Sequence, residues 1–187
     1  RPSLDQLAEW RKKLTETRAW PLEEQKAPWM VGEGNPKAEI IFIGERVEDS
    51  PPKPDKPFSG ADGQLLDKMI QAMGYQRETV FLVTLLKTSQ TNESTVGAAT
   101  LREYQEVLSS LIFSLNPKAI VTMGKLATHV LLETDTRLSR LRGRWAHYVH
   151  GDVPVMPTYP PAALIRNAHL KRPVWEDLQK VMKQVAS

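Results

Sequence analysis

Short apolar runs alternate with amphipathic stretches along this chain, a pattern that predicts interleaved strands and helices. Four mainly apolar runs have the length of strands buried on both faces, namely 38–44, 80–86, 119–123 and 153–158. Between them, apolar residues recur at helical spacing over 65–73 and 101–115, and a short helix is predicted from Gly124 to Leu132. This order predicts an α/β fold, a three-layer α/β/α sandwich around a central four-stranded parallel sheet.

The remaining segments complete one predicted domain, 1–187, in which 1–31 is an N-terminal helix and loop packed on the rest. Ser3 is a predicted N-cap for a first helix, a polar loop follows from Trp20 to Pro36, and the last helix covers about 174–185. Residues 145–149 are predicted to form a small hairpin element before the last strand.

The loops after the four predicted strands are the expected place for a ligand. Segment 46–57 carries four prolines, which neither a helix interior nor a central strand accepts, so it is predicted to leave the first strand as a loop. In parallel sheets, ligands bind at the carboxyl ends of strands. Here these ends are Ile43, Leu86, Met123 and Thr158.

Charge is unevenly distributed along the chain although the net charge is only +3. Residues 1–117 carry 14 basic and 17 acidic side chains, whereas 118–187 carry 11 basic and 5 acidic ones. This asymmetry predicts one basic face that attracts phosphate, and a solvated face without a ligand is the plain alternative. The candidate phosphate-binding residues are Arg140, Arg142, Arg144, Arg166, Lys171 and Arg172.

Three features that the sequence lacks exclude particular kinds of site and of membrane contact. The chain has no cysteine, which excludes disulfides, a thiolate nucleophile and a cysteine-held iron–sulfur cluster. No stretch approaches the roughly 20 apolar residues that span a bilayer, so a soluble, cytoplasmic protein without membrane contact is expected. The four histidines lack metal-ligand spacing, so neither a metal nor another cofactor is predicted.

Several strings resemble the uracil-DNA glycosylase superfamily, specifically its iron–sulfur bacterial and archaeal branch. They are the segments 32–38 (GEGNPKA), 41–45 (IFIGE), 57–60 (PFSG), 63–66 (GQLL), 117–124 (PKAIVTMG), 140–145 (RLRGRW) and 159–167 (YPPAALIRN), with Lys171, Arg172 and Trp175 beyond them. The resemblance covers most of the chain and implies the fold of that superfamily. It also implies that base excision requires a flipped base and a stabilised leaving anion.

The resemblance assigns the catalytic positions residue by residue. Glu45 occupies the place of the family's acidic group, Phe58 that of its stacking aromatic residue, Thr84 that of the uracil-reading Asn and Tyr159 that of the His. A threonine hydroxyl cannot supply the paired donor and acceptor of an amide, and a neutral tyrosine is a weaker helper for an oxyanion.

The family's small loop residues and its cluster cysteines are replaced as well. Bulky Arg46 and Glu48 stand where the family has small loop residues. The four cluster cysteines align with Thr17, Trp20, Thr88 and about Tyr104, where Trp20 and Tyr104 are expected to fill the cluster's space by apolar packing.

The strings that resemble the family's framework are retained, whereas its catalytic and cluster positions are replaced. Three functions are compatible with this pattern. The first interpretation is a catalytically inactive glycosylase-fold protein acting as a psi-like subunit in replication, linking the clamp loader to chi and single-stranded-DNA-binding protein. Segment 160–167 and Trp175 resemble the closing segment of psi. In psi proteins the clamp-loader contact lies in an N-terminal peptide ahead of the globular domain, and this resemblance implies such a peptide ahead of Arg1. The alternative is a cluster-free DNA glycosylase that excises uracil or another deaminated base. A third is a module that recognises a base in DNA without cutting.

Overall fold

The protein is described by a computed structural model that places residues 30–47, 57–87 and 98–187. The strands are β1 (Met30–Gly34), β2 (Ile40–Val47), β3 (Phe81–Lys87), β4 (Ala119–Met123), β5 (Ala146–His147) and β6 (Pro154–Thr158). They form one sheet in the order β1-β3-β2-β4-β6-β5. The four inner strands are parallel, and β1 and β5 are antiparallel edges.

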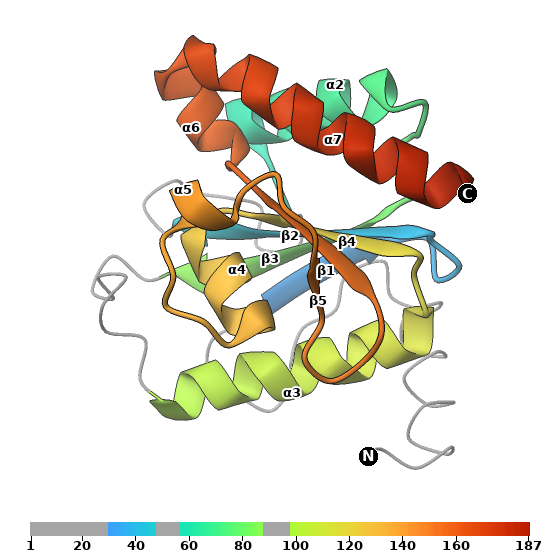
Figure 1. The fold of residues 1–187 in the computed structure, drawn as a ribbon, viewed down its shortest axis with the longest axis vertical. Coiled ribbons are helices and arrows are strands. Elements are labelled where there is room, and N and C mark those ends of the chain that lie inside the picture. The colour runs from blue at the N-terminus through green and yellow to red at the C-terminus, as the bar shows by residue number, and fades with distance from the viewer. Residues whose placement is uncertain (1–29, 48–56, 88–97) are drawn as a thin grey trace.

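Helices cover both faces of this sheet (Figure 1). They are α2 (Gly60–Ala72), α3 (Ala98–Leu115), α4 (Lys125–Leu132), α5 (Leu138–Leu141), α6 (Pro161–Arg166) and α7 (Lys171–Ala186), with a 3₁₀ turn at Ala168–Leu170. One apolar layer joins the sheet to α3 and α4, and the other joins it to α2, α6 and α7. The described part of the chain is therefore a three-layer sandwich.

Successive side chains of a strand point alternately into these two apolar layers. In β2, Ile41 and Ile43 face α3 and α4, whereas Ile40 and Phe42 face α2 and α7. All four are fully buried, which is why the strand is a continuous apolar run without the alternation of a half-exposed strand. None of the helices in the described ranges has the length and apolar character needed to cross a membrane.

The predicted sandwich and its parallel core are confirmed, and the edges of the sheet correct the prediction. The sheet has six strands, because β1 pairs with β3 in a segment predicted as loop and β5 pairs with β6. Strand β2 extends to Val47, three residues beyond its predicted end. Helices α5 and α6 were not predicted from periodicity, because four and six residues are too short to show it. The predicted first helix lies outside the described residues.

Candidate functional site

The candidate site lies at the point where the helices that follow two neighbouring strands go to opposite faces of the sheet. Strands β2 and β4 are parallel neighbours, but the helix after β2 packs on one face of the sheet and the helix after β4 on the other. The chain segments that leave the two strands therefore diverge. In open α/β sheets, ligands bind at such a point, beyond the carboxyl ends of the two strands. Glu45 near the end of β2 and Gly124 after β4 meet at this point.

The Glu45 carboxylate is fixed by the first turn of α4. The backbone N–H groups of Leu126 and Ala127 both donate to Glu45 Oε1, the second over 3.3 Å. Gly124, with φ of +100°, leaves the space for this approach, since a Cβ there would lie 3.0 Å from the same oxygen. Thr128 Oγ1 anchors the turn by donating to the carbonyl oxygen of Gly124 over 2.8 Å. The result is a negative charge held in one place by a helix start.

Phe58 lies against the opposite side of the same strand. Its ring rests on Gly44, where a Cβ would come within 2.6 Å of Phe58 Cζ, and the side chain is only 7% exposed. Successive residues of a strand point to opposite faces, so Gly44 presents bare backbone to the ring while Glu45 reaches α4. The dipeptide Gly44-Glu45 thus places an aromatic ring and a carboxylate at one strand end.

Thr84 is the neighbour of Gly44 on the adjacent strand. The two residues are register partners in the β2–β3 pair, and Thr84 is buried. Tyr159 directly follows β6 at the same edge of the sheet and packs partly against the layer that contains Phe58. The predicted positions therefore all lie on or against the inner strands: Thr84 within β3, Phe58 against β2 at Gly44, Glu45 near the end of β2 and Tyr159 just after β6. The side chains of Arg46 and Glu48 lie outside the described residues.

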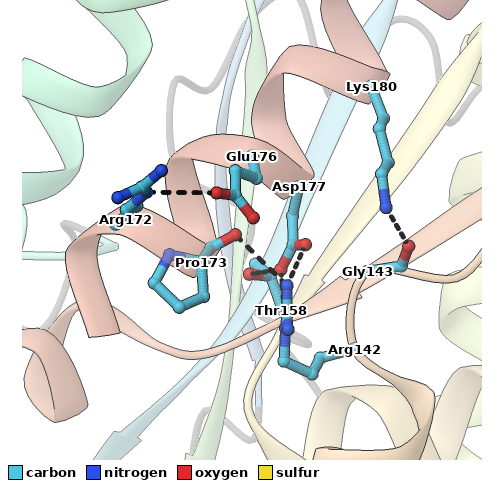
Figure 2. Close-up of polar contacts among 8 residues, drawn as sticks. All are labelled: Arg142, Gly143, Thr158, Arg172, Pro173, Glu176, Asp177 and Lys180. Carbon is cyan, nitrogen blue, oxygen red and sulfur yellow. Dashed lines mark hydrogen bonds and ion pairs between the residues drawn. The ribbon is translucent and has the colours of Figure 1, made fainter. Parts of the chain in front are cut away.

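The Asp177 carboxylate on α7 links Arg142, which follows α5, to Thr158, the last residue of β6 (Figure 2). Asp177 of α7 is fully buried and accepts from Arg142 through both oxygens, at 2.5 and 3.1 Å. Thr158 Oγ1 donates to Asp177 over 2.7 Å. The hydrogen bond to Asp177 raises the pKa of the Arg142 guanidinium against the opposing effect of burial.

The same network sets the turn beside Tyr159. Gly143 donates its backbone N–H to Pro157 over 2.9 Å, and its carbonyl oxygen accepts from Lys180 Nζ over 2.6 Å. Arg142 Cζ lies 6.0 Å from the centre of the Tyr159 ring. Of the candidate phosphate-binding residues, Arg142 is thus committed to contacts inside the fold.

The other candidate phosphate-binding residues are exposed and lie on α5, the turn after it, α6 and the start of α7. Figure 1 shows these segments at one end of the molecule, at which β4 leads into α4. Arg172 forms an exposed pair with Glu176 over 3.4 Å, and the positive charge of Arg166 opposes the rise that burial causes in the pKa of Asp62. No ion pair with a described carboxylate is formed by Arg140, Arg144 or Lys171.

Comparison with known proteins decides the family. The family model described as "Uracil DNA glycosylase superfamily" matches residues 31–179. The chain belongs to this superfamily. Relatives include the type-4 uracil-DNA glycosylases of Saccharolobus solfataricus and Sulfurisphaera tokodaii, each 31% identical. The matches cover 99% and 96% of this chain and 88% and 83% of the relatives. The type-4 enzyme of Thermotoga maritima is 30% identical over 87% of this chain and 85% of its own length.

The iron–sulfur cluster of the branch that the sequence resembles does not fit this superfamily member. The whole chain lacks cysteine, and Tyr104, near one position aligned with a ligand, is buried in the apolar layer under α3. A phenol among aliphatic side chains is no substitute for a thiolate ligand. Thr17, Trp20 and Thr88 lie outside the described residues. Within the described ranges, no three His, Asp or Glu side chains are grouped to hold a metal ion.

Two residues at the site, Asp177 and Arg77, were not predicted from the sequence. Asp177 had a usable signal, because it falls three residues after Val174 and four before Val181 on the apolar side of α7, where a carboxylate needs a partner. Arg77 had none, since it stands in a short polar link between α2 and β3. It bonds to the carbonyl oxygens of Pro57 and Phe58.

Proposed function

We propose that this protein is a cluster-free DNA glycosylase that removes uracil or another deaminated base from DNA. The observation that carries the proposal is the dipeptide Gly44-Glu45 at the point where the helices after β2 and β4 go to opposite faces of the sheet, with Phe58 on one side and a fixed carboxylate on the other. A base-excising enzyme must hold an extruded base and stabilise charge on the sugar as the base departs. An aromatic ring and an immobile negative charge are the groups suited to these two tasks.

Each residue then has a distinct role in the proposed reaction. Phe58 stacks on the extruded base, and the hydroxyl of Tyr159 or Thr84 donates to a base carbonyl oxygen on which negative charge develops. Glu45 stabilises the developing positive charge of the sugar or orients the attacking water. The exposed basic residues Arg140, Arg144, Arg166, Lys171 and Arg172 hold the phosphates.

The test is excision from single- and double-stranded oligonucleotides carrying uracil, hypoxanthine or xanthine, at low salt and high protein concentration. Glu45→Gln keeps an acceptor oxygen for α4 but removes the charge, and we expect it to lower kcat by at least about 100-fold. Glu39→Gln is the matched control, because Glu39 precedes the same strand at its other end and pairs with Lys118 on the surface. Equal excision by the wild type and Glu45→Gln would remove Glu45 from the mechanism.

The same experiment separates the competing functions. A folded wild type that binds these oligonucleotides but excises nothing is a base-recognising module, and the enzyme proposal then fails. A protein that neither binds nor cuts them returns the question to the psi-like interpretation, tested by pull-down with clamp-loader and chi subunits. The relatives named above are all glycosylases, which favours the enzyme.

A further inference from the structure

The Arg77 side chain joins three segments behind the Phe58 ring. Its Nε donates to Glu33 of β1 over 2.8 Å and its Nη1 to Asp67 of α2 over 2.9 Å. Its Nη2 donates to the carbonyl oxygens of Pro57 and Phe58, the latter over 3.3 Å. Only 13% of the side chain is exposed, so burial opposes the charge, but the bonds to Asp67 and Glu33 outweigh burial and raise its pKa.

The backbone at Phe58 needs such support. Its φ is +51°, a left-handed conformation that residues other than glycine rarely adopt. The two carbonyl oxygens that Arg77 binds belong to the peptide groups on either side of the Phe58 Cα, so one guanidinium fixes both. A residue in this conformation persists only where its surroundings hold it there.

Two glycines fit the rest of this segment into place. A Cβ on Gly63 would lie 2.0 Å from the carbonyl oxygen of Phe58, so the first turn of α2 can approach only because the residue is glycine. A Cβ on Gly44 would collide with the ring itself. The Phe58 backbone is thus pressed between Arg77 and α2, and its ring against β2.

We infer that Arg77 is the positioning residue for Phe58: the guanidinium locks a strained backbone so that the ring meets an extruded base in one orientation. This inference rests on the proposed function for the identity of the stacked group, and on the contacts above for the lock. Arg77 acts through Phe58 and is not a catalytic residue.

Fluorine NMR tests the lock directly, because the chain contains only four phenylalanines. In protein labelled with 4-fluorophenylalanine, Phe58→Leu identifies the Phe58 line. Arg77→Lys keeps the charge but cannot reach all four acceptors, so the Phe58 line should shift and broaden. The line of Phe113, 63% exposed on α3, should stay in place and serves as an internal control. Arg137→Lys, an exposed arginine, should move neither line.

A second variant keeps the test decisive where Arg77→Lys does not fold. Asp67→Asn weakens one anchor of the guanidinium at a partly exposed position, and it should move the Phe58 line in the same direction by a smaller amount. An unchanged Phe58 line in the folded variants overturns the lock, whatever the protein does to DNA.

The effect of Arg77 on the proposed reaction is tested by measuring kcat and KM separately. We expect Arg77→Lys to lower kcat about tenfold with KM for uracil-containing DNA within twofold, because phosphate contacts are untouched. A fall in melting temperature with unchanged kcat overturns the positioning role and leaves a purely structural one. Uracil-containing DNA should shift the Phe58 line of the wild type, and DNA without uracil should not. If the wild type excises nothing, the proposed function fails, and the fluorine spectra still decide the lock.

Discussion

Single residues at this site are constrained by what stands next to their backbone. Gly143 adopts φ of +73°, and a Cβ there would lie 2.6 Å from Asp177 Oδ1. Gly74 adopts φ of +86° at the end of α2, where an added Cβ meets nothing within 4 Å. The two glycines share a backbone conformation and differ in crowding.

Alanine substitution should separate these two costs. Gly74→Ala should lower the free energy of unfolding by about 1 kcal/mol, the cost of a left-handed residue with a side chain. Gly143→Ala should lower it by about 3 kcal/mol, because the same strain is joined by displacement of a buried carboxylate. Urea denaturation monitored by circular dichroism measures both. Equal losses would show that Asp177 yields to the methyl group without cost.

An ion pair between Arg142, which follows α5, and the buried Asp177 contributes to the docking of α7. Arg142→Met leaves the fully buried Asp177 carboxylate without its cation, and we expect a loss of about 3–5 kcal/mol in unfolding free energy. Arg172→Met is the matched control, because Arg172 lies on α7 like Asp177 and its exposed pair with Glu176 contributes at most about 0.5 kcal/mol.

A double variant tests whether the loss belongs to the pair. Adding Asp177→Asn to Arg142→Met removes the unpaired charge, so it should recover part of the lost stability in the same denaturation experiment. No recovery would assign the loss to apolar contacts of the arginine stem.

Elements whose own residues show a clear apolar pattern were predictable from the sequence. Elements that form only by pairing with another strand were not. Residues 119–123 were predicted to form a strand and do so, because burial on both faces leaves an unbroken apolar run. Strand β1 contains Gly32 and Gly34 and forms only by pairing with the edge of β3. Its local sequence is that of a loop.

The same limit applies to the site. The resemblance placed Glu45 after the first predicted strand, Thr84 on the second, Phe58 ahead of the next helix and Tyr159 in the last loop. The partners of these residues are distant in sequence: the amides of Leu126 and Ala127 lie more than 80 residues from Glu45. Hydrogen bonds of that kind follow from the fold and leave no local pattern.

At the scale of the molecule, positive charge is concentrated at the end that carries the candidate site. The segments α5, α6 and the start of α7 lie together there, whereas the other end of α7 lies at the opposite side (Figure 1). Lys171 and Lys183 stand on this one helix, 12 residues and about 18 Å apart.

This geometry gives a matched pair for DNA binding. Lys171→Gln should weaken binding to a DNA duplex and reduce the slope of log K against log salt concentration by about 1, because one phosphate contact is lost. Lys183→Gln makes the same charge change and should leave the slope unaltered. Fluorescence anisotropy over a range of salt concentrations measures both, and identical slopes for the two variants would place the DNA elsewhere.

The buried Asp177 also bears on the timing of synthesis. The ribosome makes Arg142 and Thr158 before it makes α7, the helix that carries their shared partner Asp177. Until then Arg142 lacks its carboxylate and the apolar layer that receives α7 is open to water. A nascent chain therefore acquires the hydrogen bonds that hold Arg142 and Thr158 only after α7 has been made, so a chain without α7 does not present the finished candidate site.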